Sequence, residues 1–436
     1  MPSNDTALAV TAVVASAQLG GTERVLLDFA NRAFEHDIVL RVVTPARGPL
    51  VEILENIGVP TAVVPGPTLM LRGSQQAGKL WSLPPALFGI LAWSRRLARH
   101  EFLRDADVVY SVAFKPHLAL ALARRHPVVW HLHEFPPQST GRFWRALSRR
   151  VPDRLIANSA AVGRSWSNGG NRTRQGDRIV VIPNGVNLDR FRPADKTFWI
   201  HDKLGIPHDR RLVGMPAVFA RWKGQVEVIK AFELVSEDIP DVHLVVVGGS
   251  IYDTVSERDY GRELAGQIAD SNTGEWVVPT VKSEEVKSET STGAQGNGKR
   301  ETDYLLVPRV HLLPFQTKIE RAYPEFDLVV HYSLRPEPFG RVIVEAMACG
   351  IPVLAADEGG PAEILGGGIG PRREAGWLVP PRDPHALARA FKTAMDLPRE
   401  VIESIGEAGR RRAEDFYSWR HFAERVADAL KTTVMP

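Results

Sequence analysis

The sequence predicts an α/β protein made of two doubly wound domains, each with a parallel sheet. With 436 residues the chain is too long for one comfortable core, and it suits two domains of about 200 residues each. Short apolar runs alternate with longer amphipathic stretches throughout, as strands and helices do in parallel sheets. A turn-rich stretch, residues 182–187 (IPNGVN), separates two such series. The domain boundary is therefore expected near residue 186.

The individual strands follow from the apolar runs. In the first half we expect strands at 8–16, 38–44, 61–64, 107–112, 127–132, 154–157 and 179–182, with helices between them such as 22–34 and 117–125. In the second half we expect strands at 212–216, 242–247, 310–313, 328–331, 352–355 and 377–379. Residues 271–303 are nearly free of apolar side chains, which predicts a disordered insertion.

Composition excludes several classes of protein. The chain is 44% hydrophobic and 24% charged, and its net charge of +3 falls short of the basic footprint of a nucleic-acid binder. The single cysteine excludes an intramolecular disulfide and a multi-cysteine metal site. Residues 7–17 are apolar, but no Lys or Arg precedes them, so we expect a first strand and a cytoplasmic protein. No apolar run reaches 18 residues, hence no spanning helix is expected.

The strongest functional signal lies in residues 331–350 (HYSLRPEPFGRVIVEAMACG). A buried strand ends there, prolines break the chain, and a helix begins, so that Glu337 follows the strand and Glu345 lies on the helix. Residues eight apart on a helix are separated by roughly 12 Å. That spacing is too wide for two carboxylates to share one reacting atom, but it suits the two ends of one extended ligand. Without further signals, a Pro-capped strand–helix junction with two surface glutamates would be the better explanation of this spacing.

The complete string Glu337-Pro338-Phe339-Gly340, followed by Val342 and Glu345, resembles the donor-binding signature of family 4 of the retaining glycosyltransferases. The resemblance implies the GT-B fold, with two Rossmann-like domains facing across a cleft. It implies an acceptor-side domain at 1–186, a nucleotide-sugar domain at 187–412 and a C-terminal helix, 413–436, that packs back on the first domain. It also implies that Glu337 lies by the donor sugar, that the backbone at Phe339 and Gly340 approaches sugar and phosphate, and that Glu345 holds the ribose.

Two further places belong to the same signature. Gly20 and Gly21 stand where the first strand meets the first helix, and glycines there let the backbone approach a ligand. A plain strand-to-helix turn is the alternative, whereas the resemblance implies contact with the diphosphate. His131 and His133 end the fifth strand on one face, and they lack a third metal ligand at recognisable spacing. The resemblance assigns His133 to the donor sugar, with His131 as its rival.

Arg221 and Lys223 stand at the start of the first helix of the second domain. Two cations there make a clamp for a diphosphate and would neutralise a departing nucleotide without metal. Lys223 matches the family motif. Arg221 departs from it, because the usual arginine stands several residues earlier, where this chain has the apolar segment 217–219. We place Arg221 with Lys223 among the candidate catalytic and donor-binding residues, and two possibilities stay open for it: it takes the place of the usual arginine, or it forms an ordinary surface ion pair.

Other patterns leave choices open. Asp105 and Asp107 fit D-x-D, the metal-binding pattern of A-type glycosyltransferases, but they precede a strand, which favours a turn. Residues 357–363 (DEGGPAE) resemble another donor-side loop of the family. Aromatic side chains neighbour arginines at 80–99 and 143–154, as in helices that lie on anionic membranes and also in ordinary amphipathic helices.

Together these features predict a metal-independent, retaining glycosyltransferase that moves a sugar from a nucleotide-sugar to a hydroxyl of a glycan, lipid or small molecule. It would need no cofactor and no nucleic acid, and peripheral membrane contact stays open. The alternatives are a GT-B-fold sugar-nucleotide 2-epimerase, a non-catalytic nucleotide-sugar-binding scaffold, and a metal-dependent A-type enzyme using Asp105 and Asp107.

Overall fold

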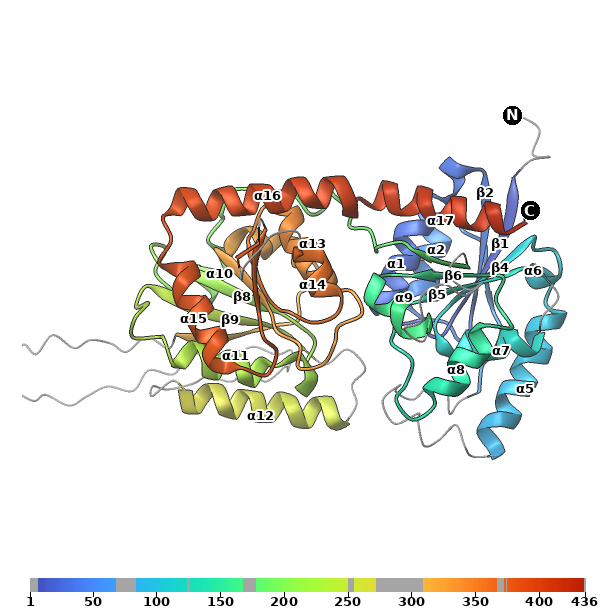
Figure 1. Cartoon of the computed structure of the whole chain (residues 1–436), viewed down its shortest axis with the longest axis horizontal. Helices are drawn as coiled ribbons and strands as arrows, with labels where there is room; N and C mark the ends of the chain where they lie inside the picture. The colour runs from blue at the N-terminus through green and yellow to red at the C-terminus, as the bar shows by residue number, and fades with distance from the viewer. Residues whose placement is uncertain are drawn as a thin grey trace, which may run out of the picture.

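A computed structural model describes residues 7–67, 84–123, 126–167, 178–249, 255–271, 309–366, 372–373 and 375–434. Two α/β domains lie side by side, and the last two helices run along one side of both (Figure 1). Nearly all of the expected insertion, 272–303, lies outside the described residues, as does the start of the aromatic stretch at 80–83.

The first domain contains a seven-stranded sheet in the order β3-β2-β1-β4-β5-β6-β7, with every neighbouring pair parallel. Its strands are β1 (Leu8–Val14), β2 (Ile38–Thr44), β3 (Thr61–Val63), β4 (Val108–Val112), β5 (Val128–Leu132), β6 (Arg154–Ala157) and β7 (Ile179–Val181). The strand order reverses between β1 and β4, as in other doubly wound sheets. All seven predicted strands are confirmed: β2 and β6 have the predicted bounds, and one end of each of the others is shifted by one or two residues.

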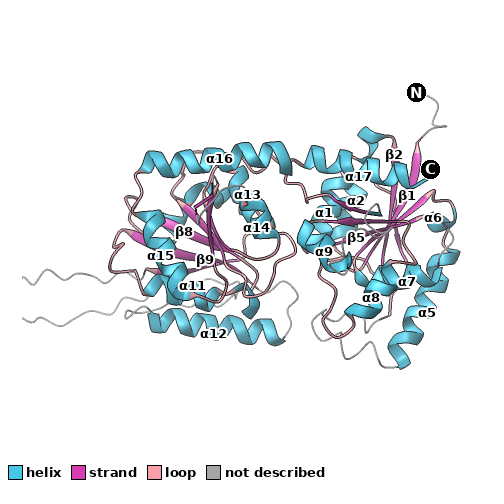
Figure 2. Cartoon of the chain, viewed as in Figure 1, coloured by secondary structure: helices cyan, strands magenta, loops and turns pink. Residues whose placement is uncertain are grey.

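The helices of this domain alternate with its strands. They are α1 (Gly21–Ala30), η1 (Ala33–His36), α2 (Pro49–Asn56), α5 (Pro84–Arg99), α6 (Glu101–Arg104), α7 (Phe114–Ala123), α8 (Gly141–Ser148) and α9 (Ala160–Ser167). Figure 2 shows helices on both faces of the sheet. The strands are accordingly buried on both sides; every residue of β4 and β5 is buried.

The second domain repeats the design with the order β10-β9-β8-β11-β12-β14-β13. Its strands are β8 (Arg211–Pro216), β9 (Val242–Gly248), β10 (Val310–Pro314), β11 (Leu328–His331), β12 (Val353–Ala356), β13 (Arg372–Arg373) and β14 (Gly376–Val379). The six parallel strands match the predicted ones. The two-residue β13, which pairs antiparallel with β14, is too short to leave an apolar pattern and was not predicted.

The helical segments of the second domain surround this sheet. They are α10 (Trp199–Leu204), η4 (Arg221–Lys223), α11 (Gln225–Glu233), α12 (Val255–Ser271), η5 (Ile319–Arg321), η6 (Tyr323–Glu325), α13 (Arg341–Ala348), α14 (Gly360–Leu365) and α15 (Pro384–Met395). α13 and α14, which follow β11 and β12, face the first domain (Figure 1).

The C-terminal helices connect the two domains. α16 (Arg399–Tyr417) packs on the second domain, and α17 (Trp419–Val434) buries Phe422, Val426 and Leu430 in the core of the first. Ser418, in extended conformation, separates the two helices and pairs with Val186 of the interdomain linker. The helix that crosses to the first domain therefore begins at Trp419, because α16 continues unbroken through residue 413.

Candidate functional site

A buried ion pair lies at the end of β11. Lys223 Nζ donates to both carboxylate oxygens of Glu337, at 2.9 and 2.8 Å, and the two side chains are only 13% and 14% exposed. Ser333 Oγ donates to the same carboxylate at 2.8 Å. Two residues 114 positions apart are thus brought together at the carboxyl end of the sheet, where ligands of open α/β folds bind.

Glycines make this approach possible. Gly224 adopts φ +73°, and a Cβ there would lie 2.2 Å from the carbonyl oxygen of Tyr332, so the turn that carries Lys223 packs directly on the chain after β11. The Trp222 carbonyl accepts from the Leu334 amide at 2.7 Å. Only glycine combines this backbone conformation with so close a contact.

The predicted donor-side loop 357–363 supports Glu337 from the other side. Gly359 adopts φ +71° and forms an isolated parallel bridge with Glu337, and the Gly360 amide donates to the Glu337 carbonyl at 2.8 Å. A Cβ on Gly359 would lie 2.4 Å from that carbonyl oxygen. Gly359 and Gly360 therefore pack directly against the backbone of Glu337 and fix its position, in addition to forming a turn.

Charges determine the protonation of this pair. Burial alone would raise the pKa of Glu337, but the charge of Lys223, with smaller contributions from His331 and from the hydrogen bonds of Lys223 and Ser333, lowers it. His331 Nε2 lies 3.7 Å from the carboxylate, and burial lowers the pKa of His331 to about 4. At neutral pH Glu337 is thus a carboxylate and His331 a neutral imidazole.

A second cluster lies on α13. The Glu345 carboxylate accepts from the Tyr323 hydroxyl at 2.8 Å and lies 3.4 Å from Arg341 Nε. Arg341 Nη1 donates to Asp28 on α1 of the first domain at 2.9 Å. Glu345 is therefore held from both sides, and its cluster spans the contact between the domains.

Phe339, Gly340 and Val342 shape the helix that carries Glu345. Phe339 is buried and packs edge-on against Tyr417, with ring centroids 6.0 Å apart, so its backbone and not its ring is available to a ligand. Gly340 is the N-cap of α13 at φ +105°, and Val342 packs against the core. The free amides of the first turn of α13 thus follow directly after Glu337.

The first domain places other predicted residues at the ends of β1 and β5. Gly20 caps α1 in extended conformation, and a Cβ on Gly21 would meet nothing within 4 Å, so this turn has open space beside it. His133 lines a pocket together with Thr22, and its Nε2 has no hydrogen-bond partner among the described residues. Burial, and then the charge of Arg341 from the other domain, lower the pKa of His133 to about 3.

His131 is less suited than His133 to contact a ligand. It is fully buried, and its Nδ1 shares a hydrogen bond with the Tyr110 hydroxyl inside the sheet. Glu23, in the first turn of α1, is also buried, and desolvation raises its pKa to about 7. A carboxyl group that titrates near neutral pH beside the Gly20–Gly21 turn left no signal in the sequence, because its burial depends on the packing of α1.

Arg221 forms an ion pair at the surface of the second domain. Its guanidinium pairs with Glu263 of α12 and lies over the ring of Tyr260, and its side chain is 67% exposed. Among the described residues its guanidinium bonds Glu263, and it forms no ion pair with Glu337. Arg221 therefore forms the surface ion pair that the sequence analysis left open as an alternative.

The aspartates of the D-x-D pattern have structural contacts. Asp107 Oδ2 accepts from the amide of Ala9 at 2.8 Å and so ties β4 to β1, while Asp105 caps the end of α6. No group of three metal-ligating side chains occurs among the described residues. Metal independence therefore stays a prediction that only a measurement tests.

A second contact between the domains uses Glu363 on α14. Its carboxylate accepts from the amides of Ala160 and Ala161, at 2.8 and 2.5 Å, and lies 3.4 Å from Arg164. The free amides at the start of α9 are thus capped by a residue of the other domain. Glu363 lies in the predicted donor-side loop 357–363, but its contact with α9 was not predicted. Asp28, Tyr323 and Arg341 were not predicted as part of the site, since none of these residues has a local pattern that reveals its partner.

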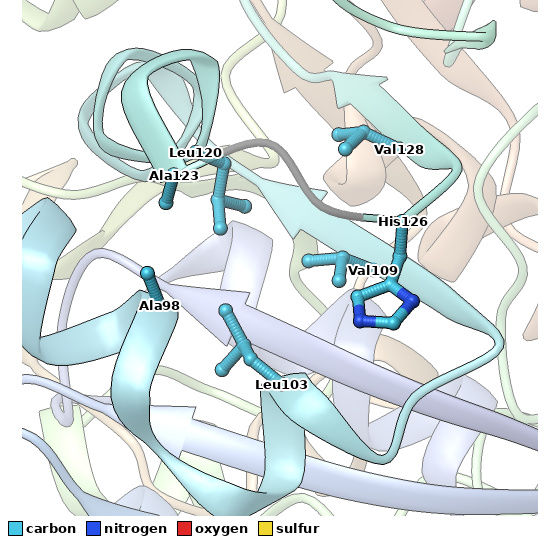
Figure 3. A pocket seen from close by; sticks show the side chains of 7 residues that line it. All are labelled: Ala98, Leu103, Val109, Leu120, Ala123, His126 and Val128. Atoms are coloured by element: carbon cyan, nitrogen blue, oxygen red, sulfur yellow. The ribbon is translucent and has the colours of Figure 1, made fainter.

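A separate apolar pocket lies at the opposite edge of the first sheet, beside the beginnings of β4 and β5 (Figure 3). Its lining comes from α5, α6, α7 and these strands, and includes Leu103, Leu120 and His126. None of the predicted site residues belongs to it. On the surface nearby, Phe88 of α5 is 71% exposed while Trp93 is buried, so α5 is amphipathic, and membrane contact stays a prediction. Within the described chain no helix is both long and apolar enough to cross a bilayer.

Two doubly wound sheets in series, with a buried cation–carboxylate pair at the carboxyl end of the second, are typical of the GT-B class of scaffold. Comparison with known families agrees. The profile described as "Glycosyl transferases group 1" matches residues 197–273 and 298–412, and that of "Glycosyltransferase Family 4" matches residues 19–190. The chain belongs to glycosyltransferase family 4.

Individual relatives support this assignment. A D-inositol 3-phosphate glycosyltransferase of Streptomyces scabiei is 30% identical over 294 residues, which cover 64% of this chain and 54% of the relative. A GDP-mannose-dependent alpha-(1-6)-phosphatidylinositol monomannoside mannosyltransferase of Mycolicibacterium smegmatis is 28% identical over 57% of this chain and 55% of its own. The matched region thus spans about half the length of these relatives.

Among solved structures, Anabaena Alr3699/HepE in complex with UDP and glucose superposes with a TM-score of 0.72. It is 25% identical, and the match covers 98% of this chain and 100% of that one. The predicted GT-B architecture is therefore confirmed over nearly the whole chain.

Proposed function

We propose that this protein transfers a sugar from a nucleotide-sugar donor to an acceptor hydroxyl, with retention at the anomeric carbon and without a metal ion. The observation that carries the proposal is the buried Lys223–Glu337 pair, which lies directly before the helix that holds Glu345. The cation and the free helix amides suit the diphosphate of one donor, the Glu337 carboxylate suits its sugar, and the Glu345 carboxylate suits its ribose.

Each group then has a role set by its position. Lys223 and the first-turn amides of α13 stabilise the departing diphosphate, together with the backbone at Gly20 and Gly21. Glu337 and the neutral His133 orient the sugar, and Glu345 accepts hydrogen bonds from the ribose hydroxyls. The acceptor oxygen replaces the diphosphate oxygen at the anomeric carbon, and the acceptor proton leaves with the diphosphate.

The relatives narrow the choice of substrates to be tested. One relative's name specifies GDP-mannose, a solved neighbour binds UDP and glucose, and the acceptors named for the relatives are an inositol phosphate and a phosphatidylinositol mannoside. These names put UDP- and GDP-sugars first in a thermal-shift screen of donors, and ADP-sugars are screened with them. A donor at a hundred times its Kd stabilises the native state by about 2.7 kcal/mol, or roughly 5–10 °C for a domain of this size.

The decisive experiment compares Glu337→Ala with Glu424→Ala, which removes an exposed carboxylate on α17. We expect Glu337→Ala to abolish transfer while nucleotide binding is largely kept, Glu424→Ala to behave as wild type, and EDTA to leave transfer unchanged. Full turnover by Glu337→Ala would remove the assignment. An altered sugar nucleotide formed without any acceptor would instead identify the 2-epimerase, and donor binding without any product would identify a scaffold.

A further inference from the structure

The cations where the two domains meet differ in whether they have a carboxylate partner. Lys223 is paired with Glu337, and Arg341 is shared between Asp28 and Glu345. Lys223 and Arg341 are therefore each already paired with a carboxylate in the protein. The arginine that the sequence assigned to the diphosphate, Arg221, is paired with Glu263 on the surface.

Arg24 of the first domain has no such partner. Among the described residues, no carboxylate lies within the 4.0 Å of an ion pair from its guanidinium, although the residue is partly buried. Its charged neighbours are Glu345, Arg341, Arg190 and Asp28, two of which lie on α13 of the other domain. Burial, more than any of these charges, lowers the pKa of Arg24.

The position of Arg24 follows from helix geometry. It lies in the first turn of α1, where its amide donates to the Gly20 carbonyl at 3.1 Å. Asp28 is four residues further along and so lies on the same face of the helix. Because Asp28 bonds Arg341 in the first turn of α13, this face of α1 is directed at the start of α13. Arg24 therefore lies between the Gly20–Gly21 turn and the helix that carries Glu345.

We propose that Arg24 binds the diphosphate of the donor from the first domain and supplies the second cation that the sequence assigned to Arg221. This inference rests on the proposed function. Lys223 and Arg24 then contact the diphosphate from opposite domains, and each phosphate group gains a charged donor without breaking the Arg341 cluster. A guanidinium that has no carboxylate partner within the described part of the chain is well suited to bind phosphate oxygens in pairs.

The test measures Kd by titration calorimetry for UDP, GDP or ADP, whichever binds the wild type, and for the matching nucleoside. We expect Arg24→Gln to raise the Kd of the diphosphate by about tenfold to a hundredfold, the effect of losing a hydrogen bond to a charged group. The Kd of the nucleoside, which has no phosphate, should stay within about twofold. Arg24→Lys should give an intermediate value, and Arg99→Gln, at an exposed site at the end of α5, should match wild type.

Other outcomes overturn the inference. Unchanged diphosphate binding by Arg24→Gln would do so, as would an equal loss for diphosphate and nucleoside, which would indicate a structural role. A tenfold loss in Arg221→Gln with none in Arg24→Gln would return the role to Arg221. Arg24→Met, which keeps the apolar part of the side chain, replaces Arg24→Gln if that variant does not fold. If the wild type binds none of the nucleotides, the proposed function itself fails, so the two failures can be told apart.

Discussion

Replacing Lys223 by methionine should destabilise the second domain through the carboxylate that it leaves behind. Methionine keeps an unbranched side chain against Trp222, over whose ring Lys223 Nζ lies at 4.2 Å. The Glu337 carboxylate, with its side chain 14% exposed, would lose both bonds to Lys223 and keep the one from Ser333. Removing one partner of a buried pair costs about 3–5 kcal/mol, and the remaining hydrogen bond places this site near 3 kcal/mol.

The pH dependence gives the prediction its sign. In the wild type the pKa of Glu337 is lowered, so its contribution to stability is present above the unfolded pKa and is lost as pH falls through the folded one. In Lys223→Met, burial without the neighbouring charge favours the protonated carboxyl, and the deficit shrinks when the group binds a proton. The variant should therefore melt about 6–12 °C below wild type at about pH 8, and much closer to it at about pH 5.

Thermal unfolding followed by circular dichroism at the two pH values measures this difference. The double variant Lys223→Met/Glu337→Gln is the control, since it has no charge to leave unpaired and should recover most of the loss. A deficit below about 1 kcal/mol, or an equal deficit at both pH values, would refute the reasoning, because Glu337 would then not be a charged group that depends on Lys223.

Two further predictions concern groups near the domain contact. The folded pKa of Glu23 is raised to about 7, so the native state is destabilised as pH rises from 4.5 towards 7. Above that range Glu23→Gln should be more stable than wild type by up to about 3 kcal/mol. Urea unfolding that gives the variant and the wild type the same free energy of unfolding both below and above this pH range would contradict the prediction. Glu363→Ala should uncap α9 at a cost of about 1–2 kcal/mol and loosen the domains. Small-angle scattering should then show a larger radius of gyration, whereas an unchanged value would mean that the other contacts hold the arrangement alone.

The sequence predicted most of the second domain's contribution to the site. Lys223, Glu337 and Glu345 lie in short motifs whose local structure, a strand followed by a turn and a helix, is encoded by adjacent residues. Their positions at the carboxyl ends of β8 and β11 follow from that local structure, because parallel strands place these ends at one edge. The roles of these residues toward a ligand remain proposals.

The pattern of apolar residues by itself predicted the strands of the two sheets, because a strand that is buried in a parallel sheet consists mainly of apolar residues. Only the tertiary structure decided which charges meet between the domains. Asp28 and Arg341 are 313 residues apart, and their contact depends on how α16 and α17 hold the two sheets together. The ion pair of Arg221 likewise depends on α12, which carries Glu263. Ion pairs of this kind have no period in sequence, because they are set by the distances between packed helices.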